Sequence, residues 1–284
     1  MNLLDFIPPI ENEMRRILAL ADGENFHSLH YMMAYHLGWE GEGAGPNASG
    51  KRVRPILVLL TASAAGGDWH VALPAAAAVE LLHNFSLIHD DIEDDSPLRR
   101  GRPTVWKLWG IPQAINTGDT MFTLANLAVL ELALPPERTL QAARIFQRTC
   151  LRLTQGQFLD ISYEDERSLP LEAYWPMVGG KTAALLAACT ELGALCAEAS
   201  PEAQEAYREF GEKLGLAFQA LDDELGIWGD EALMGKSAAS DLLEGKKSLP
   251  VLYGLAQEGE FARRWMAGPL TPQEIPALAA QLEA

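Results

Sequence analysis

Cysteine is scarce in this chain, which has three cysteines among its 284 residues. No two of them have the C-x-x-C spacing that is typical of zinc and dithiol sites. Cys189 and Cys196 lie seven positions apart in an Ala/Leu-rich stretch, and Cys150 is distant from both. We therefore predict that all three are reduced core residues.

Positive charge is also scarce. The chain has 22 Lys and Arg against 39 Asp and Glu, which gives a formal net charge of -17. Because a nucleic-acid-binding surface needs a broad basic patch, this balance argues against nucleic acid as a partner. An anionic ligand must instead meet local basic groups, and such groups cluster within residues 51–54, 99–102 and 236–247.

Membrane and export signals are hard to find. Segment 55–67 is apolar but shorter than the roughly 18 to 20 residues that a helix needs to cross a bilayer. Residues 1–16 contain Asp5, Glu11 and Glu13 and do not begin with basic residues followed by an apolar run. We expect no signal peptide, no transmembrane segment and a cytoplasmic location.

Strand-like alternation is rare, whereas helical spacing of apolar residues is frequent. Five long stretches have this spacing, at 71–92, 112–133, 137–161, 171–197 and 201–228. They predict an all-α fold. The breaks are short, at 38–50, 96–103, 134–136 and 199–201. Since no repeat or change in composition marks a boundary, we predict one helical domain over residues 1–284.

The most informative motif is the acidic run Asp90–Asp95, with five carboxylates in six residues, followed by Arg99, Arg100 and Arg102. In a helix, Asp90 and Asp94 would share one face. Carboxylate and phosphate oxygens are ligands that Mg²⁺ prefers, and arginine binds phosphate through paired N–H groups. This motif therefore predicts Mg²⁺ bound between carboxylates and a diphosphate.

A second acidic motif, at residues 218–226, also lies in a helical pattern, where Gln219 and Asp223 would share a face. Departure of a diphosphate from carbon builds negative charge on the leaving oxygens. Metal ions with nearby Arg and Lys stabilise that charge. Two facing acidic helices can thus support diphosphate chemistry without an acidic side chain as proton donor.

The order of motifs resembles the trans-isoprenyl diphosphate synthase (polyprenyl synthetase) family over almost the whole chain. Segment 50–55, GKRVRP, resembles the family's GKRxRP motif, and segment 80–91 resembles the approach to its first DDxxD motif. Further similar segments are Leu98-Arg99-Arg100-Gly101, Gly156-Gln157-Phe158-Leu159-Asp160, Gly180-Lys181-Thr182-Ala183, Phe218-Gln219 with Asp222-Asp223, and Gly235-Lys236 leading through Asp241 to Gly245-Lys246.

The resemblance implies packed helices around a deep central cavity, a homodimer, and Mg²⁺ as cofactor. It implies a transferase of isoprenoid biosynthesis that condenses an allylic diphosphate with isopentenyl diphosphate. The residues that it assigns to catalysis are Asp90, Asp91, Asp94, Lys181, Thr182 and Gln219, and those assigned to metal are Asp90, Asp94 and Asp222. It assigns the allylic diphosphate to Arg99, Lys181, Thr182, Gln219, Lys236 and Lys246, and isopentenyl diphosphate to Lys51, Arg54, His83 and Arg100.

Product length should depend on residues below the first acidic motif. Phe85 lies five residues before Asp90, where a large ring would close the cavity floor, and Ser86 beside it is small. No residues are inserted between Asp90 and Asp94. By resemblance we expect a short-chain all-trans product, geranylgeranyl diphosphate, with farnesyl diphosphate as the alternative. Plain core packing is the alternative role of Phe85.

The sequence departs from the family pattern in three places. Gly226 stands where the second motif often ends in Asp, Ala239 stands where many members have Gly, and the chain ends at Ala284, earlier than most relatives, which suggests that a final helix is missing. Because of Gly226, a non-catalytic subunit that regulates a prenyl synthase remains an alternative function. A terpene cyclase would not need Lys51, Arg54 and Arg100.

Structural alternatives exist for single motifs. An acidic run is commonly a solvated face, and a lone histidine such as His83 is commonly a hydrogen-bonded core residue. Lys181-Thr182 can mark a helix start after Gly179-Gly180. Gln157 and Asp160 can form a buried pair that satisfies itself or lie near the reacting carbocation.

Overall fold

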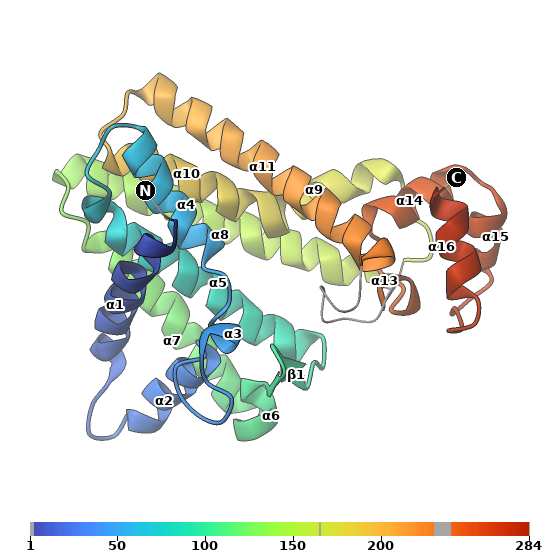
Figure 1. The fold of residues 1–284 in the computed structure, drawn as a ribbon, viewed down its shortest axis with the longest axis horizontal. Helices are drawn as coiled ribbons and strands as arrows, with labels where there is room; N and C mark the ends of the chain where they lie inside the picture. Colours follow the sequence, from blue (N-terminus) through green and yellow to red (C-terminus); the bar gives the residue numbers. More distant parts are fainter. Residues whose placement is uncertain (1–2, 165, 230–239, 284) are drawn as a thin grey trace. The chain divides into compact units, whose positions relative to one another are not determined.

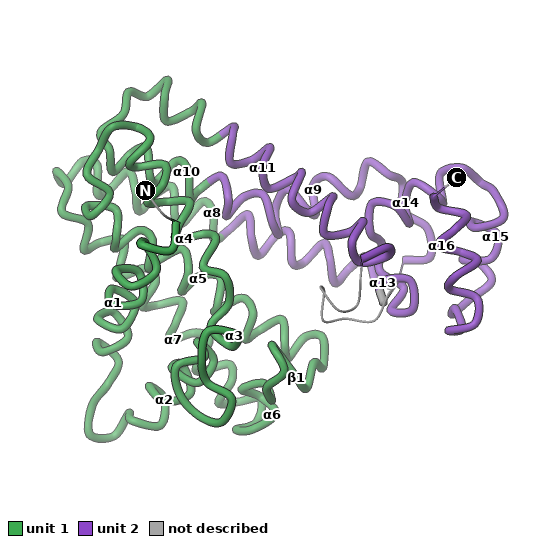
Figure 2. The backbone as a smooth tube through the Cα atoms, viewed as in Figure 1, with its two compact units in different colours: residues 1–150, 188–208 green, residues 151–187, 209–284 purple. Residues whose placement is uncertain are grey.

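The computed structural model describes residues 3–164, 166–229 and 240–283, drawn as a ribbon in Figure 1. Their internal contacts group the chain into two compact units, coloured separately in Figure 2. Unit 1 comprises Met1–Cys150 and Ala188–Arg208, and unit 2 comprises Leu151–Ala187 and Glu209–Ala284. The boundaries fall inside helices, not in linkers. The single domain expected from the sequence stays a prediction.

Unit 1 begins with short helices whose apolar faces are buried. In α1, Ile10, Met14 and Ile17 recur every three or four residues and are fully buried, which is the pattern of one helix face. The helices of this part are η1 (Leu3–Phe6), α1 (Ile7–Leu18), η2 (Ala19–Ala21), α2 (His27–His36), α3 (Pro46–Ser49), α4 (Val53–Ala64) and η3 (Trp69–Ala72).

The centre of unit 1 is the contact between α5 (Leu73–Glu93) and α7 (Ile111–Leu130). Ala75–Ala78 are fully buried in α5. Gly118 lets α7 approach closely, because a Cβ at that position would lie 2.3 Å from His89 Nε2 of α5. Small residues on packed helix faces permit such an approach, and this packing fixes the helix that ends at the first acidic motif.

Residues 69–93 are, among the described residues, the one helical segment long and apolar enough to cross a membrane by length and composition, with a mean hydropathy of 1.5. The expectation of no such segment rested on residues 55–67 and overlooked this one. In the structure, 61% of its most apolar window is buried, and α5 packs against α1, α4 and α7. This burial accounts for the composition as that of a core helix.

A small hairpin follows α5, where the sequence indicated only a turn. β1 (Leu98–Arg99) pairs with β2 (Arg102–Pro103) in antiparallel register, and α6 (Val105–Trp109) follows. Arg100 and Gly101 have φ of 52° and 75°. A two-residue hairpin of type I′ requires positive φ at both central residues. The turn therefore fixes where the two adjacent arginines, Arg99 and Arg100, leave the backbone.

Arg102 anchors this hairpin. Its guanidinium donates to the carbonyl oxygens of Tyr35 at 2.8 Å, Glu40 at 2.6 Å and Glu42 at 2.9 Å. It also lies 3.9 Å from the centre of the Tyr35 ring. Since Arg102 is 7% exposed and its donors are engaged, the interpretation that it binds phosphate together with Arg99 and Arg100 is wrong for this residue.

Three long helices have residues in both units: α8 (Pro136–Glu164), α10 (Ala184–Cys196) and α11 (Pro201–Trp228). The core of unit 2 contains Tyr174, Leu242 and Val251, each at most 1% exposed. The other helices of unit 2 are η4 (Leu171–Ala173), α9 (Tyr174–Val178), η5 (Gly179–Ala183), α13 (Ser240–Leu243), α14 (Leu249–Ala256), α15 (Glu260–Met266) and α16 (Ile275–Glu283).

The all-α prediction is confirmed, and the five predicted helical stretches correspond to helices in the structure. Four of them are the long helices α5, α7, α8 and α11. The fifth, 171–197, is helical throughout but divides into η4, α9, η5 and α10. The prediction of buried, reduced cysteines is also confirmed for Cys150, Cys189 and Cys196.

Candidate functional site

The first acidic motif forms the C-terminal end of α5. Asp90 lies in the last turn, and the C-cap residue Asp94 donates its backbone N–H to Asp90 O at 2.8 Å. The two residues are thus one turn apart, as their spacing predicted. A helix C-terminus carries partial negative charge. Further carboxylates at Glu93 and Asp95 add to it, so this end of α5 strongly favours a bound cation.

Asp91 holds Arg99 beside this motif. Arg99 Nε donates to Asp91 Oδ1 at 2.7 Å, and Asp91 is 1% exposed. Burial raises the pKa of Asp91 to about 6, although Arg99 opposes the shift. Its other oxygen, Oδ2, is buried and has no hydrogen-bond partner among the described residues. Asp91 therefore orients a predicted phosphate ligand, while its predicted catalytic role stays a prediction.

The four residues predicted to bind isopentenyl diphosphate all lie in unit 1. Arg54 Nη1 lies 3.1 Å from His83 Nε2, which connects the 50–55 segment to α5. Arg100 Nη1 donates to Ala48 O at 2.9 Å, and a Cβ at Gly50 would lie 2.9 Å from Arg100 Nη2. These contacts bring the GKRVRP segment, the hairpin turn and α5 together. Lys51 is exposed at the start of this segment.

Positive charge is concentrated around His83. Burial lowers the pKa of His83 well below its usual value, and Arg54, Arg100 and Arg99 lower it further. A neutral ring can accept the Arg54 hydrogen bond at Nε2. His83 therefore has a hydrogen-bond partner, as expected for a histidine with a structural role. It is also part of a basic site suited to an anion.

His36 lies in the same electrostatic environment, and sequence reasoning missed it. It is 8% exposed in the last turn of α2. Burial, followed by Arg100, Arg99 and Arg52, lowers its pKa well below the usual value. No motif includes His36, so a single sequence gives no signal that would connect it to the arginines.

In unit 2, the second acidic motif belongs to a chain of hydrogen bonds. Thr182 Oγ1 donates to Gln219 Oε1 at 2.7 Å, and Gln219 Nε2 donates to Asp223 Oδ1 at 2.8 Å. Asp223 Oδ2 accepts from the Tyr174 hydroxyl at 2.7 Å and from the Leu249 N–H at 2.9 Å. Both Asp223 oxygens are therefore engaged, which supports the choice of the exposed Asp222 as the metal ligand.

Lys181 and Thr182 lie in η5, a π-helical segment, and not at a helix start. The helix-start alternative is therefore wrong. Gly156 of α8 causes the close contact here, because a Cβ on it would lie 2.1 Å from Lys181 N. Lys181 forms an ion pair with Asp160. Asp160 of α8 is thus paired with a residue of η5. Neither the buried Gln157–Asp160 pair nor the position near the carbocation, the two hypotheses for these residues, included this ion pair. Single π-turns in helices are frequent at functional sites.

Gly226 provides space for another carboxylate. A Cβ at Gly226 would lie 2.2 Å from Asp241 Oδ2, and Asp241 is 8% exposed. Asp241 Oδ1 in turn lies 3.6 Å from Lys246 Nζ, a predicted ligand of the allylic diphosphate. The structure thus puts the Asp241 carboxylate where a side chain at position 226 would begin. Lys236 and Ala239 lie outside the described residues.

Phe85 packs against a second aromatic ring that sequence reasoning missed. Its ring centre lies 5.0 Å from that of Phe122 of α7 and 4.7 Å from that of His89. Phe85 is half-buried, so its packing on Phe122 agrees with the packing alternative without deciding it, and a role in product length stays a prediction that now includes Phe122. The two residues are far apart in sequence, so only the α5–α7 contact reveals the pair.

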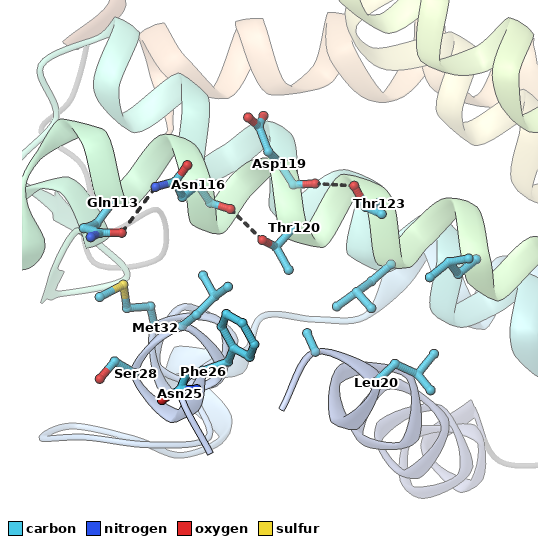
Figure 3. Close-up of a pocket in the computed structure, with 14 residues that line it drawn as sticks. Leu20, Asn25, Phe26, Ser28, Met32, Gln113, Asn116, Asp119, Thr120 and Thr123 are labelled. Atoms are coloured by element: carbon cyan, nitrogen blue, oxygen red, sulfur yellow. Dashed lines mark hydrogen bonds between the residues drawn. The ribbon is translucent and has the colours of Figure 1, made fainter. Parts of the chain in front are cut away.

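Each unit has a surface pocket without predicted site residues. In unit 1, a pocket of about 640 Å³ lies between the α2 region and α7, with Phe26 and Met32 facing α7 in Figure 3. Thr120 and Thr123 there donate to carbonyls of their own helix. In unit 2, a pocket of about 660 Å³ is lined by Gly156, Gly180 and Trp175, among others. The deep central cavity implied by the resemblance remains a prediction.

Within residues 3–164, 166–229 and 240–283, no group of three His, Cys, Asp or Glu side chains is arranged to hold a metal ion. Asp90 and Asp94 belong to unit 1 and Asp222 to unit 2, and each is described within its own unit. Their joint action on one metal cluster stays a prediction.

Comparison with known proteins gives concordant matches. The sequence model of one family, described as polyprenyl synthetase, matches residues 45–274. A (2E,6E)-farnesyl diphosphate synthase of Mycobacterium tuberculosis is 44% identical over 83% of this chain. A geranylgeranyl diphosphate synthase of the same species is 43% identical over 81% of it. The matched region spans 66% of the length of each of these relatives.

Solved structures agree with the fold. A polyprenyl synthetase from Streptomyces coelicolor superposes with a TM-score of 0.88 at 38% identity, covering 97% of this chain and 84% of that one. A polyprenyl synthase from Caulobacter crescentus, solved with calcium and isoprenyl diphosphate, gives a TM-score of 0.81 at 28% identity, covering 99% of this chain and 83% of that one. This chain is therefore similar to them along nearly its whole length.

Proposed function

The chain belongs to the polyprenyl synthetase family, and from that membership we propose that the whole protein is a Mg²⁺-dependent prenyl transferase. It condenses an allylic diphosphate with isopentenyl diphosphate and yields a short-chain all-trans prenyl diphosphate. The related synthases named for farnesyl and geranylgeranyl products support this substrate class.

The observation that carries the proposal is the meeting of opposite charges in unit 1. Carboxylates gather at the C-terminal end of α5, where the helix dipole is already negative. Arg99 is held beside them by Asp91, while Arg54, His83 and Arg100 form the adjacent basic group. A metal ion and a diphosphate together complement both groups, since the ion relieves the carboxylates and the arginines bind phosphate oxygens.

The donor set fits magnesium. Mg²⁺ usually retains several waters and is bound by one or two carboxylates plus substrate phosphates, so it needs no preformed cage of three protein ligands. We assign Asp90, Asp94 and Asp222 as its ligands. When bound, the metal would stabilise negative charge on the departing diphosphate. The Caulobacter structure with calcium and isoprenyl diphosphate supports a divalent cation in this family.

The protein's own residues bind, orient and shield the substrates. Arg99, Lys181, Thr182, Gln219, Lys236 and Lys246 bind the allylic diphosphate, and Lys51, Arg54, His83 and Arg100 bind isopentenyl diphosphate. The allylic C–O bond breaks and releases diphosphate, the double bond of isopentenyl diphosphate attacks the carbocation, and loss of one proton completes the new chain. An apolar, water-excluding environment protects the cation.

We propose geranylgeranyl diphosphate as the product, with farnesyl diphosphate as the alternative. Phe85 and Phe122 support a short product, because two packed rings would obstruct a cavity below the acidic motif. A cytoplasmic location and a homodimer belong to the same proposal.

A non-catalytic regulatory subunit is the second candidate, and Gly226 is the observation that favours it. The missing carboxylate at 226 weakens the second motif, although the neighbouring Asp241 carboxylate keeps negative charge at that place. This candidate predicts no turnover by the purified protein alone.

The deciding experiment is incubation of the purified full chain with labelled isopentenyl diphosphate and Mg²⁺. Dimethylallyl, geranyl and farnesyl diphosphate are supplied in turn, and the products are separated by chromatography. We expect a labelled product extended by five-carbon units, and its loss with EDTA and in a folded Asp90→Ala variant. Absence of extension with all three primers would overturn the proposal, and a cyclic hydrocarbon would identify a terpene cyclase instead.

A further inference from the structure

We propose that Arg52 is a positioning residue for isopentenyl diphosphate. In this proposal, which rests on the function proposed above, Arg52 does not touch the substrate. Its buried ion pairs with Glu11 and Glu80 instead fix the loop that presents Lys51 and Arg54.

The first observation is the backbone of Arg52. This residue precedes α4 as its N-cap and has φ 50° and ψ 32°, in the left-handed region. Residues other than glycine adopt this conformation rarely and at an energetic cost, so the surrounding structure must hold it. The conformation sets the direction in which Lys51 leaves the loop on one side and Arg54 enters α4 on the other.

The second observation is what holds it. Arg52 Nε donates to Glu11 Oε1 at 2.6 Å, and Nη1 donates to Glu80 Oε1 at 2.8 Å. The Arg52 side chain is 1% exposed and that of Glu80 4% exposed. Charges so deeply buried are stable only when paired and hydrogen-bonded. Because its guanidinium is committed to these partners, Arg52 is not a diphosphate ligand, unlike its exposed neighbour Lys51.

The third observation is that the partners of Arg52 connect the loop to the site. Glu80 lies one turn before His83 in α5 and accepts from Asn84 Nδ2 at 3.1 Å. On the other side, Arg100 donates to Ala48 O, and its guanidinium lies against the place that a Cβ at Gly50 would take. Segment 48–52, from the end of α3 to the start of α4, is thus held at both ends, by Arg52 to α1 and α5 and by Arg100 to the hairpin. Releasing Arg52 should misplace Lys51 and Arg54 while leaving the acidic motif intact.

The test compares affinities for the two substrates in Arg52→Gln and Arg52→Lys variants of the full chain. Calorimetry measures the Kd for isopentenyl diphosphate, and steady-state kinetics give KM for isopentenyl and geranyl diphosphate. We expect Arg52→Gln to raise the Kd and KM for isopentenyl diphosphate at least tenfold and to change KM for geranyl diphosphate less than twofold. Arg52→Lys keeps the charge, so its Kd and KM for isopentenyl diphosphate should lie between those of the wild type and of Arg52→Gln. Arg16→Gln is the matched control, since the Arg16 pairs with Glu13 and Glu131 are solvent-exposed.

An unchanged Kd for isopentenyl diphosphate in folded Arg52→Gln, or equal losses for both substrates, would overturn the inference. If Arg52→Gln does not fold, the Glu11→Gln variant is tested instead. It removes only the ion pair between Arg52 and Glu11, and the Glu11 side chain is 19% exposed. We expect at least a threefold weaker Kd from that change, and wild-type affinity would equally overturn the inference. If the wild type itself neither binds isopentenyl diphosphate nor extends a primer, the proposed function fails instead.

Discussion

At the scale of residues, the clearest feature is a pair of histidines kept neutral by burial and by nearby arginines. His36 is buried and His83 half-buried, and both lie in the positive field of Arg99 and Arg100, with Arg54 or Arg52 added. A protonated ring there would meet both desolvation and like charge, so the folded state binds protons less readily than the unfolded state. This has a direct consequence for stability at acidic pH.

We predict that the His83→Gln variant loses part of the pH dependence of stability. The pKa of His83 is lowered on folding, so its stabilising contribution is present above the unfolded pKa of about 6.5 and is lost as pH falls below it. The free energy of unfolding should thus fall more steeply in the wild type, by up to about 1.4 kcal/mol per pH unit. Urea unfolding at pH 7.5, 6.0 and 5.0 measures the slope.

His27→Gln is the control for this prediction, since the His27 side chain is 71% exposed. It removes an imidazole that lies outside the arginine cluster and so controls for the loss of a histidine as such. Equal slopes for His83→Gln and the wild type below pH 6.5 would show that His83 is not held neutral.

We also predict that restoring the family residue with Gly226→Asp is harmful. The new Cβ would lie 2.2 Å from Asp241 Oδ2, and a second carboxylate would face a buried one. Overpacking of this kind costs about 1–3 kcal/mol. Urea unfolding should show that loss, and adding Asp241→Ala should recover part of it. Wild-type stability in the single variant would contradict the packing described for Gly226.

Single residues also show where sequence reasoning ends. Asp90, Lys181 and Gln219 could be selected because they stand in recognisable motifs. Partner residues could not, since Asp160 reaches Lys181, and Tyr174 reaches Asp223 of the second motif, only through packing of distant helices. Arg102 was misjudged for the same reason, because nothing in its motif indicates that it is buried under three backbone carbonyls.

At the scale of elements, long helices could be predicted and irregular segments could not. Helices such as α5 and α11 have enough turns for a clear apolar period. The hairpin at 98–103 has strands of two residues each and depends on the contacts of Arg102, so it has no periodicity to detect. The π-helical segment η5 lies close against Gly156 in α8, and this approach is again a tertiary feature.

This approach predicts a specific effect for Gly156→Ala. A Cβ there would lie 2.1 Å from Lys181 N, and a backbone atom inside a helix cannot easily move away. We expect a loss of about 1–3 kcal/mol in stability and a higher KM for the allylic substrate, because Lys181 and Thr182 would shift. Urea unfolding and steady-state kinetics measure the two effects.

Gly259→Ala provides the matched control, because a Cβ at Gly259 would meet no atom within 4 Å. It should change stability by less than about 0.5 kcal/mol. If Gly156→Ala behaved like this control, the contact between α8 and η5 would not position Lys181.

At the scale of the whole molecule, the resemblance, the family match and the helical fold agree over nearly the full chain. What remains to be measured is the length of the product and the arrangement of metal. Both depend on residues from several elements, and both are therefore proposals about the complete protein.

We predict that Phe85→Ala lengthens the product. Removing the ring opens space beside Phe122, whose centre lies 5.0 Å away, and chain growth would continue past the wild-type length. Chromatography of products from farnesyl diphosphate and labelled isopentenyl diphosphate measures this. Phe122→Ala should act in the same direction, and an unchanged product in both variants would place the cavity floor elsewhere.

The central claim is that the two acidic motifs bind Mg²⁺ together with a diphosphate. A crystal structure of the protein with Mg²⁺ and an unreactive allylic thiolodiphosphate tests it most directly. We predict Mg²⁺ ions in contact with Asp90, Asp94 and Asp222 and with the diphosphate oxygens. Ions bound elsewhere, with the carboxylates of Asp90 and Asp94 free of metal, would contradict the claim.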